Sequence, residues 1–185
     1  RAYQYGEMVV YHGGMPYITK AQDKDEDDLY VTRTSTAECF DLIIKDLDDA
    51  IALLPAKATG NDYGRIDQCF AKAYKAKMLL YKASPQFNPS NMYDNKYWNE
   101  AYTAAKEAYD FCIAQGIKLT ANYADNWLVD GNSEVVFPII YSNPDKTANW
   151  ENTIRPSSLS RSNAGNTPTW DMVKAFPMLD GKRFD

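Results

Sequence analysis

The sequence predicts a mainly α-helical protein, in which helical hairpins stack side by side and lead into an irregular, loop-rich region. Apolar residues recur three and four positions apart in the long segments before residue 116, which is the spacing of one buried helix face. Beyond that point the periodicity ends, and turn-forming Asn, Gly, Ser and Pro become frequent. The 185 residues, 45% of them hydrophobic, are enough to bury a genuine core.

The first segment, residues 1–12, is expected to be the end of a helix, because Gly13-Gly14 supplies a left-handed C-cap. An extended polar loop follows and carries an acidic run at 23–28. This run lacks the alternating oxygen ligands, the central Gly and the final Glu of an EF-hand. A solvated charge run is therefore the preferred interpretation, and a loose site for a single ion stays open.

The next helix is expected to begin at Ser35 or Thr36, either of which can cap it, and to stop at Pro55. Its apolar residues share one face and are Phe40, Ile43, Ile44, Leu47, Ile51 and Leu54. Two more helices are predicted, over 66–84 and over 97–115. Their succession is typical of tetratricopeptide-like stacking, so residues 1–116 are expected to form a helical scaffold.

The stretch between the last two helices raises a separate question, because an aromatic and an amide side chain follow the helix stop directly. Pro85 ends the helix and disfavours a helical conformation for the residue before it. Phe87 can then fold back over the end of the apolar helix, and Asn88 supplies turn chemistry. We therefore interpret this stretch as a joint between helices and not as a binding site.

Residues 117–185 are expected to form a loop-rich part of the same domain, with one short strand in NSEVVFPIIYS, residues 132–142. Trp127, in the compact sequence YADNWL, is expected in the core. The polar segment 143–170 is long for a structureless loop, and loops of that length are usually functional or disordered. A short helix, WDMVKAF, is expected to begin near Trp170 after the capping sequence TPT.

Composition excludes several classes of function. The net charge of −5 argues against nucleic-acid binding, which needs a basic face. No stretch approaches the roughly 18 apolar residues of a membrane span. No CxxC pair occurs among Cys39, Cys69 and Cys112, so we expect all three cysteines to be buried as small hydrophobic side chains. The single histidine, His12, follows a helix end and is assigned no chemistry, and neither a metal site nor a cofactor is expected.

Six phrases follow one another along the chain: RAYQYGEMVVYHGGMPYIT (1–19), DDLYVTRTSTAECFDLIIKDLDDAIALLP (27–55), GRIDQCFAKAYKAKMLLYKASPQFN (64–88), YWNEAYTAAKEAYDF (97–111), NSEVVFPI (132–139) and TPTWDMVKAFPMLDGK (167–182). In this order they resemble the SusD/RagB family of surface nutrient-binding lipoproteins from Bacteroidetes. Each phrase alone is weak, being helical or turn-like, whereas six of them in the family's order over most of the chain are specific.

The resemblance implies a tetratricopeptide-like scaffold in an outward-facing lipoprotein of the outer membrane. Such proteins are anchored by an N-terminal lipidated cysteine, sit as a lid over a TonB-dependent (SusC-like) transporter and capture oligosaccharides or other nutrients. The sequence departs from the family in having no signal peptide, no lipidated cysteine and no long C-terminal part. We therefore expect an internal fragment, with the anchor inferred from the family.

The ligand residues of this family vary between members, so the binding site is predicted from chemistry. Sugars stack on aromatic rings through their CH face, while amide and guanidinium groups hydrogen-bond their hydroxyls. The segment 143–170 and its flanks supply that mixture. The candidate residues are Trp150 as platform, Asn149, Asn152 and Arg155 as polar partners, and Tyr141 or Trp170 as a second wall.

The sequence does not favour an enzyme, and one alternative to glycan capture stays open. A glycoside hydrolase needs two carboxylates at a defined separation. Asp48-Asp49 is better explained as solvated surface, and the spacing of Glu134 and Glu151 fixes no pair. Neither GxSxG, nor a phosphate-binding Gly loop, nor HExxH occurs in the sequence. The remaining alternative is a tetratricopeptide-like module that binds only proteins or peptides.

Overall fold

Four long helices dominate the first of two units in the chain. The computed structural model describes residues 1–142, 144–148, 151–154, 158 and 165–183, and the chain divides into the compact units Arg1–Ile139 and Ile140–Asp185. The helices of the first unit are α1 (Ala2–His12), α2 (Thr36–Leu53), the single 3-10 turn η1 (Gly60–Asp62), α3 (Gln68–Ala83), α4 (Tyr97–Ala114) and the short α5 (Asp125–Leu128).

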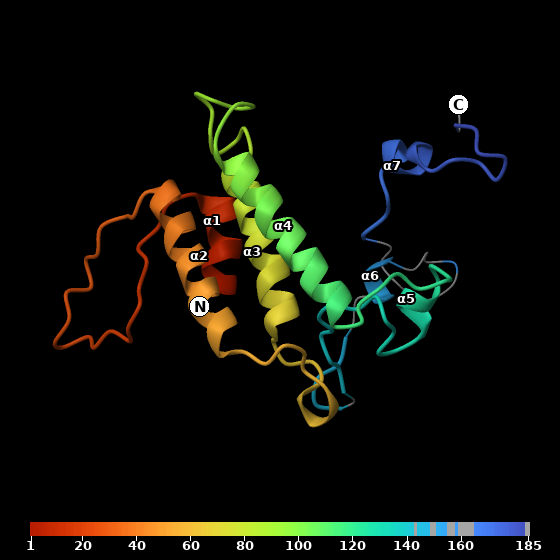
Figure 1. Ribbon diagram of the computed structural model, residues 1–185, viewed down its shortest axis with the longest axis horizontal. Helices are drawn as coiled ribbons and strands as arrows, with labels where there is room; N and C mark the ends of the chain where they lie inside the picture. Colours follow the sequence, from red (N-terminus) through yellow and green to blue (C-terminus); the bar gives the residue numbers. More distant parts are fainter. Residues whose placement is uncertain (143, 149–150, 155–157, 159–164, 184–185) are drawn as a thin grey trace. The chain divides into compact units, whose positions relative to one another are not determined.

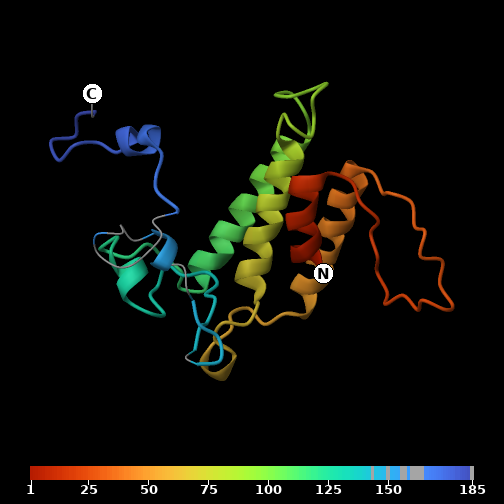
Figure 2. The same ribbon diagram turned by 180° about the vertical axis from the view of Figure 1, so that it is seen from behind.

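The long helices stack as hairpins. α2 packs against both α1 and α3, and α3 makes its most extensive contact with α4. Figures 1 and 2 show the four helices side by side, with each connection reversing the direction of the chain. The prediction of a mainly α-helical fold with stacked hairpins is therefore confirmed.

The helix ends follow the local signals in the sequence. Gly13 ends α1 with a positive φ of 70° and donates its N–H to Val9 O at 2.9 Å. Ser35 caps α2, because its Oγ accepts a hydrogen bond from Glu38 N at 3.3 Å. Asp67 caps α3 in the same way.

The main core lies where α1, α2 and α3 meet. Its buried members are Val9, Met15, Cys39, Phe40, Ile43, Leu47, Tyr74 and Met78. Gly6 lets α1 approach α3 closely, since a Cβ atom there would lie 2.3 Å from the Tyr74 hydroxyl oxygen and 2.9 Å from Met78 Sδ. Cys69 and Cys112 are buried in a second cluster between α3 and α4. All three cysteines are therefore buried, as predicted.

The joint between α3 and α4 is structural, as predicted. The Phe87 ring contacts the Phe40 ring edge to face, with centroids 5.0 Å apart, so it covers the end of the main core. Asn88 Nδ2 donates to Ser84 O at 3.2 Å and also to the carbonyl of Lys82. These bonds satisfy carbonyls at the end of α3 that have no partner within the helix.

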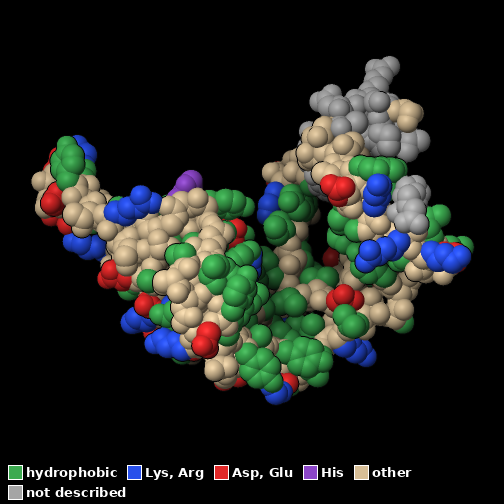
Figure 3. Space-filling view, turned by 90° about the horizontal axis from the view of Figure 1, so that it is seen from above, with side chains coloured by type: hydrophobic (Ala, Val, Ile, Leu, Met, Phe, Trp, Pro, Cys, Tyr) green, Lys and Arg blue, Asp and Glu red, His purple; other side chains and the backbone are tan. Residues whose placement is uncertain are grey.

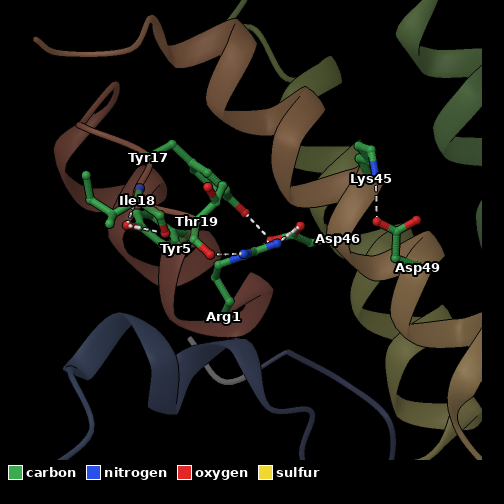
Figure 4. A network of polar contacts seen from close by, with 8 residues as sticks. All are labelled: Arg1, Tyr5, Tyr17, Ile18, Thr19, Lys45, Asp46 and Asp49. Atoms are coloured by element: carbon green, nitrogen blue, oxygen red, sulfur yellow. Dashed lines mark hydrogen bonds and ion pairs between the residues drawn. The ribbon is translucent and has the colours of Figure 1, made fainter. Parts of the chain in front are cut away.

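A polar network ties the segment after α1 to α2 (Figure 4). The Arg1 guanidinium binds both carboxylate oxygens of Asp46 and donates to Thr19 O at 2.9 Å. Tyr5 stacks on Tyr17, with centroids 4.1 Å apart, and its hydroxyl accepts from the backbone N–H of Ile18 at 2.8 Å. The turn after α1 is therefore held by side chains from both flanking helices.

The predicted strand at 132–142 is wrong. In the part of the chain that the structure describes, no strand is present, and the backbone pairing closest to one is a single bridge between Ser142 and Lys146. A strand needs a partner that offers a ladder of backbone groups, and the neighbouring elements are helices. Val136 packs instead against the cluster of Cys69, Cys112 and Ile117, and the centroid of the Phe137 ring lies 4.7 Å from that of Phe70 on α3.

The second unit contains two short helices among its described residues, α6 (Glu151–Ile154) and α7 (Trp170–Ala175). Thr169 caps α7, since its Oγ1 accepts a hydrogen bond from Met172 N at 3.3 Å. The helix predicted after the sequence TPT is therefore confirmed.

Candidate functional site

The residues predicted to bind a sugar all lie in the second unit, and the structure describes only some of them. Asn149, Trp150 and Arg155 lie outside the described residues, and the side chain of Asn152, in α6, is not described either. Tyr141 and Trp170 are exposed, with exposed fractions of 52% and 59%. Each of these two rings has a lysine over it, Lys146 at 5.4 Å and Lys174 at 5.9 Å from the ring centres.

The first unit contains a cleft rich in aromatic side chains, which we call the aromatic cleft. It has a volume of about 770 Å³ and lies between α1, α3 and the segment 123–137. Its lining residues are Tyr3, Glu7, Phe70, Ala73, Tyr74, Lys77, Tyr123, Asn126, Trp127, Glu134, Val135, Val136 and Phe137. Six of these side chains are aromatic and four are polar or charged, the mixture expected of a small-molecule site.

The helical wall of the aromatic cleft follows from residue spacing. Tyr3 and Glu7 are four positions apart on α1, so both side chains lie on one face of that helix. On α3, Phe70 and Tyr74 have the same spacing, with ring centroids 5.7 Å apart. The Tyr3 and Tyr74 rings meet across the two helices at 5.1 Å. The two helix faces therefore form one aromatic surface.

The opposite wall is the segment around α5. The rings of Tyr123 and Trp127 lie 6.5 Å apart at an angle of 66°, and each side chain has an exposed fraction of 75%. Asn132 fixes this segment, because its Nδ2 donates to Asp125 O at 3.2 Å and to Val129 O at 3.0 Å. Two aromatic rings are thus presented to solvent on a backbone that is held by hydrogen bonds.

The expectation that Trp127 belongs to the core is therefore wrong. α5 has only four residues, so it has no apolar face long enough to pack into the core. Trp127 also follows two turn-forming residues, Asp125 and Asn126. The signal that sequence analysis missed is the pair of polar residues directly before Trp127, together with the turn sequence Asp130-Gly131 shortly after it.

Polar groups in the aromatic cleft are already oriented by protein partners. The Tyr74 hydroxyl lies 3.0 Å from Glu7 Oε1 and 3.2 Å from Tyr3 O. Burial and the hydrogen bond to Glu7 raise the pKa of Tyr74 above its ordinary value, so this hydroxyl stays protonated. Lys77 Nζ lies 3.7 Å from Glu7 Oε1, which places one ion pair at the helical wall.

Glu134 is the acidic residue that lines the aromatic cleft from the segment 123–137. Its Oε2 accepts hydrogen bonds from Thr120 N and Thr120 Oγ1, both at 3.1 Å. The bond from the Thr120 backbone N–H lowers the pKa of Glu134, so this carboxylate is ionised at neutral pH. The aromatic cleft therefore offers ring faces for stacking together with oriented hydrogen-bond acceptors.

The acidic run at 23–28 has ordinary surface partners. Lys20 Nζ lies 2.7 Å from Asp27 Oδ1, and Asp27 Oδ2 accepts from Asp23 N at 2.8 Å. Figure 3 shows acidic and basic side chains together on this loop, at the left of the view. Across the described residues, no three His, Cys, Asp or Glu side chains converge on a possible metal site. Nor does any described helix have the length and apolar character needed to cross a membrane.

SusD-like proteins are found in each of three comparisons with known proteins. A SusD-like family described as "Starch-binding associating with outer membrane" matches residues 1–80. SusD-like protein P38 of Formosa agariphila is 24% identical over 173 residues, covering 82% of this chain and 33% of that protein. The crystal structure of a SusD-like protein from Bacteroides fragilis has a TM-score of 0.63 and 28% identity, covering 78% of this chain and 26% of that one. The chain thus spans about a third or less of the length of these relatives.

Proposed function

We propose that the protein, whose chain belongs to the SusD/RagB family, captures oligosaccharides or polysaccharides at the cell surface without transforming them. The captured glycan passes to a TonB-dependent, SusC-like transporter of the outer membrane, and a lipid anchor holds the protein on the outward-facing side. Family membership supports the location and the class of ligand. The aromatic cleft supports the binding step.

The observation that carries this proposal is a pair of exposed rings, Tyr123 and Trp127, that line the same cleft as the aromatic surface of α1 and α3. A pyranose has an apolar CH face and a rim of hydroxyls, so it pairs with an aromatic ring and with hydrogen-bond acceptors at once. Tyr123 and Trp127 offer ring faces to solvent, and the Glu134 carboxylate and the Asn126 amide lie on the same wall. At about 770 Å³, the aromatic cleft has the size of a small-ligand site, which is typically about 300–1,000 Å³.

The site predicted in the second unit remains a separate proposal. Trp150 would act as platform, with Asn149, Asn152 and Arg155 as polar partners and Tyr141 or Trp170 as a second wall. Exposed rings at Tyr141 and Trp170 are compatible with it. Trp150→Ala and Trp127→Ala therefore belong in the same set of binding experiments.

Capture without hydrolysis is supported by the partners of the acidic pair on α2. Asp48 binds Lys75 at 2.6 Å and Asp49 binds Lys45 at 2.5 Å, and both carboxylates are more than half exposed. Glycoside hydrolysis needs two carboxylates placed on either side of the scissile bond, whereas these two are neighbours on the surface of one helix and are each occupied by a lysine. This pair therefore matches the predicted solvated surface.

Calorimetric titration against a panel of host, plant and algal polysaccharides, followed by analysis of the sugars for products, tests the proposal. We expect saturable binding to at least one glycan, with the glycan recovered at its original chain length. Release of shorter sugars by the pure protein would show that it hydrolyses the glycan and does not only capture it. Binding to none of the glycans would overturn the proposal.

A protein-binding module is the second candidate, because α3 and α4 carry an apolar groove of about 650 Å³ with Tyr109 and Leu119 exposed beside it. Grooves on stacked helices can hold a peptide. If that is the only function, Tyr109→Ala weakens binding of a partner protein such as the transporter, while no glycan binds. Under the capture proposal, Tyr109→Ala leaves glycan affinity unchanged.

A further inference from the structure

We propose that the aromatic cleft selects glycans built from uncharged sugars and disfavours those that carry carboxylate or sulfate groups. This inference rests on the proposed function and adds the class of ligand. It follows from the distribution of charge around the exposed rings.

The wall that carries Tyr123 and Trp127 contains acidic groups and no basic ones. The segment 123–137 has three carboxylates, Asp125, Asp130 and Glu134, and neither Lys nor Arg. The backbone of Lys118 is hydrogen-bonded to Ser133, but Lys118 lines the apolar groove on α3 and α4 and not the aromatic cleft. Glu134 lines the aromatic cleft, and Asp125 adjoins the lining residue Asn126. Charges interact strongly within about one Debye length, roughly 8 Å at physiological salt, so the Glu134 carboxylate acts directly on a ligand in the aromatic cleft. Asp125 adds a second negative charge to the same segment.

The helical wall does not offset this charge. Lys77 is the one cation among the lining residues of the aromatic cleft, and its Nζ is 3.7 Å from the Glu7 carboxylate. The same ammonium group lies over the rings of Tyr74 and Tyr81, 5.6 and 5.7 Å from their centres. Lys77 is therefore engaged with its own wall, and the lining as a whole keeps an excess of one negative charge.

Glu134 stays ionised at neutral pH, so it repels a negatively charged ligand. Its two hydrogen bonds from Thr120 favour the ionised form, and the pKa of Glu134 is lowered accordingly. A carboxylate accepts hydrogen bonds and donates none. Sugar hydroxyls can donate to it, whereas a uronate or sulfate group brings a like charge and no proton.

Matched pairs of polymers test this inference, because each pair shares a backbone and differs in charge. Soluble starch is compared with carboxymethyl starch, dextran with carboxymethyl dextran, and hydroxyethyl cellulose with carboxymethyl cellulose, by calorimetry at low and high NaCl. We expect one neutral member to bind, and its carboxymethyl partner to bind about tenfold more weakly at low salt. The difference should shrink at high salt, because exposed charges are screened.

Two charge variants locate the effect. Asp125→Asn/Asp130→Asn/Glu134→Gln should reduce the discrimination against the carboxymethyl polymer. Asp23→Asn/Asp25→Asn/Glu26→Gln removes as many charges from the exposed loop and should leave the discrimination unchanged. The salt series on the wild-type protein decides the question even where the first variant does not fold.

The possible results separate the two proposals. Neutral and carboxymethyl members that bind equally, or a carboxymethyl member that binds more tightly, overturn the inference and leave glycan capture intact. Binding by no member of any pair or of the wider panel overturns both.

Discussion

The hydroxyl of Tyr17 donates a hydrogen bond of 2.6 Å to Asp46 Oδ2, which joins the segment after α1 to the middle of α2. Asp46 is also bound by Arg1 through both carboxylate oxygens, and its side chain is only 10% exposed. Removing the charge leaves the Arg1 guanidinium and the partly buried Tyr17 hydroxyl with a weaker acceptor. We expect Asp46→Asn to lower the free energy of unfolding by about 1–3 kcal/mol in urea denaturation.

Asp49→Asn is the matched control on the same helix. Asp49 pairs with Lys45 at 2.5 Å, but both side chains are more than 60% exposed. Exposed ion pairs contribute little, so we expect a change below about 1 kcal/mol. Equal effects of the two substitutions would refute a structural role for the network in Figure 4.

The Asp46 contribution should depend on pH in one direction. The hydrogen bond from Arg1 is the main reason that the pKa of Asp46 lies below its ordinary value. A carboxyl whose pKa is lowered by folding stabilises the protein above its unfolded pKa of about 3.9, and that contribution is lost as the pH falls through the lower, folded pKa. The stability difference between wild type and Asp46→Asn should therefore be full above about pH 5 and shrink below about pH 4.

Gly6→Ala should destabilise the protein although alanine favours helices. The gain in helix propensity is about 1 kcal/mol. Against it, the new Cβ would lie 2.3 Å from the Tyr74 hydroxyl oxygen and force α1 away from α3. We expect a net loss of about 1–3 kcal/mol in chemical denaturation. A more stable Gly6→Ala protein would show that α1 and α3 do not approach each other this closely.

Phe87→Ala tests the joint between α3 and α4. The half-buried Phe87 ring contacts Phe40 at 5.0 Å, so its truncation should cost about 2–3 kcal/mol of unfolding free energy. The neighbouring Gln86 is exposed, and Gln86→Ala should change the stability by less than about 0.5 kcal/mol. Glycan affinity should stay the same in both variants. A loss of glycan binding in Phe87→Ala with normal stability would show that the joint is itself a binding site.

The three thiols should react slowly in the folded protein. All of them are buried, and burial raises the pKa of Cys69 to about 12 and also raises the pKa of Cys112. The reactive thiolate of Cys69 and Cys112 is therefore scarce at pH 8, and Cys39 is fully buried out of reach of a reagent. An aromatic disulfide reagent should label the three cysteines only after unfolding in guanidinium. Rapid labelling of any cysteine in the native protein would contradict this burial.

The helical half of the fold could be predicted because its signals are local. Ser35 caps α2, Gly13 ends α1 and Pro85 follows the end of α3, and each acts through its own backbone or side chain. Periodicity also identified the buried face of α2, including Phe40 and Leu47. Such features need no knowledge of distant residues.

The aromatic cleft could not be predicted in the same way, because residues far apart in the sequence build it. Tyr3 and Tyr74 are brought together by helix stacking, and Gly6 sets how closely the helices approach. The exposure of Trp127 depends on what packs around a four-residue helix. The prediction of a strand around Val136 failed for a related reason. Its apolar and β-branched residues suit burial against a sheet, but they suit burial against helices equally well.

The most direct test of the central claim is the affinity of Trp127→Ala for the glycan that the wild-type protein binds. Trp127 is 75% exposed, so its loss should leave the melting temperature within about 2 °C and weaken binding at least about tenfold. Tyr102→Ala, which removes another exposed ring on α4 outside the aromatic cleft, should change neither quantity. Unchanged affinity in a folded Trp127→Ala protein would contradict the aromatic cleft as the glycan site, and a loss in Trp150→Ala alone would move the site to the second unit.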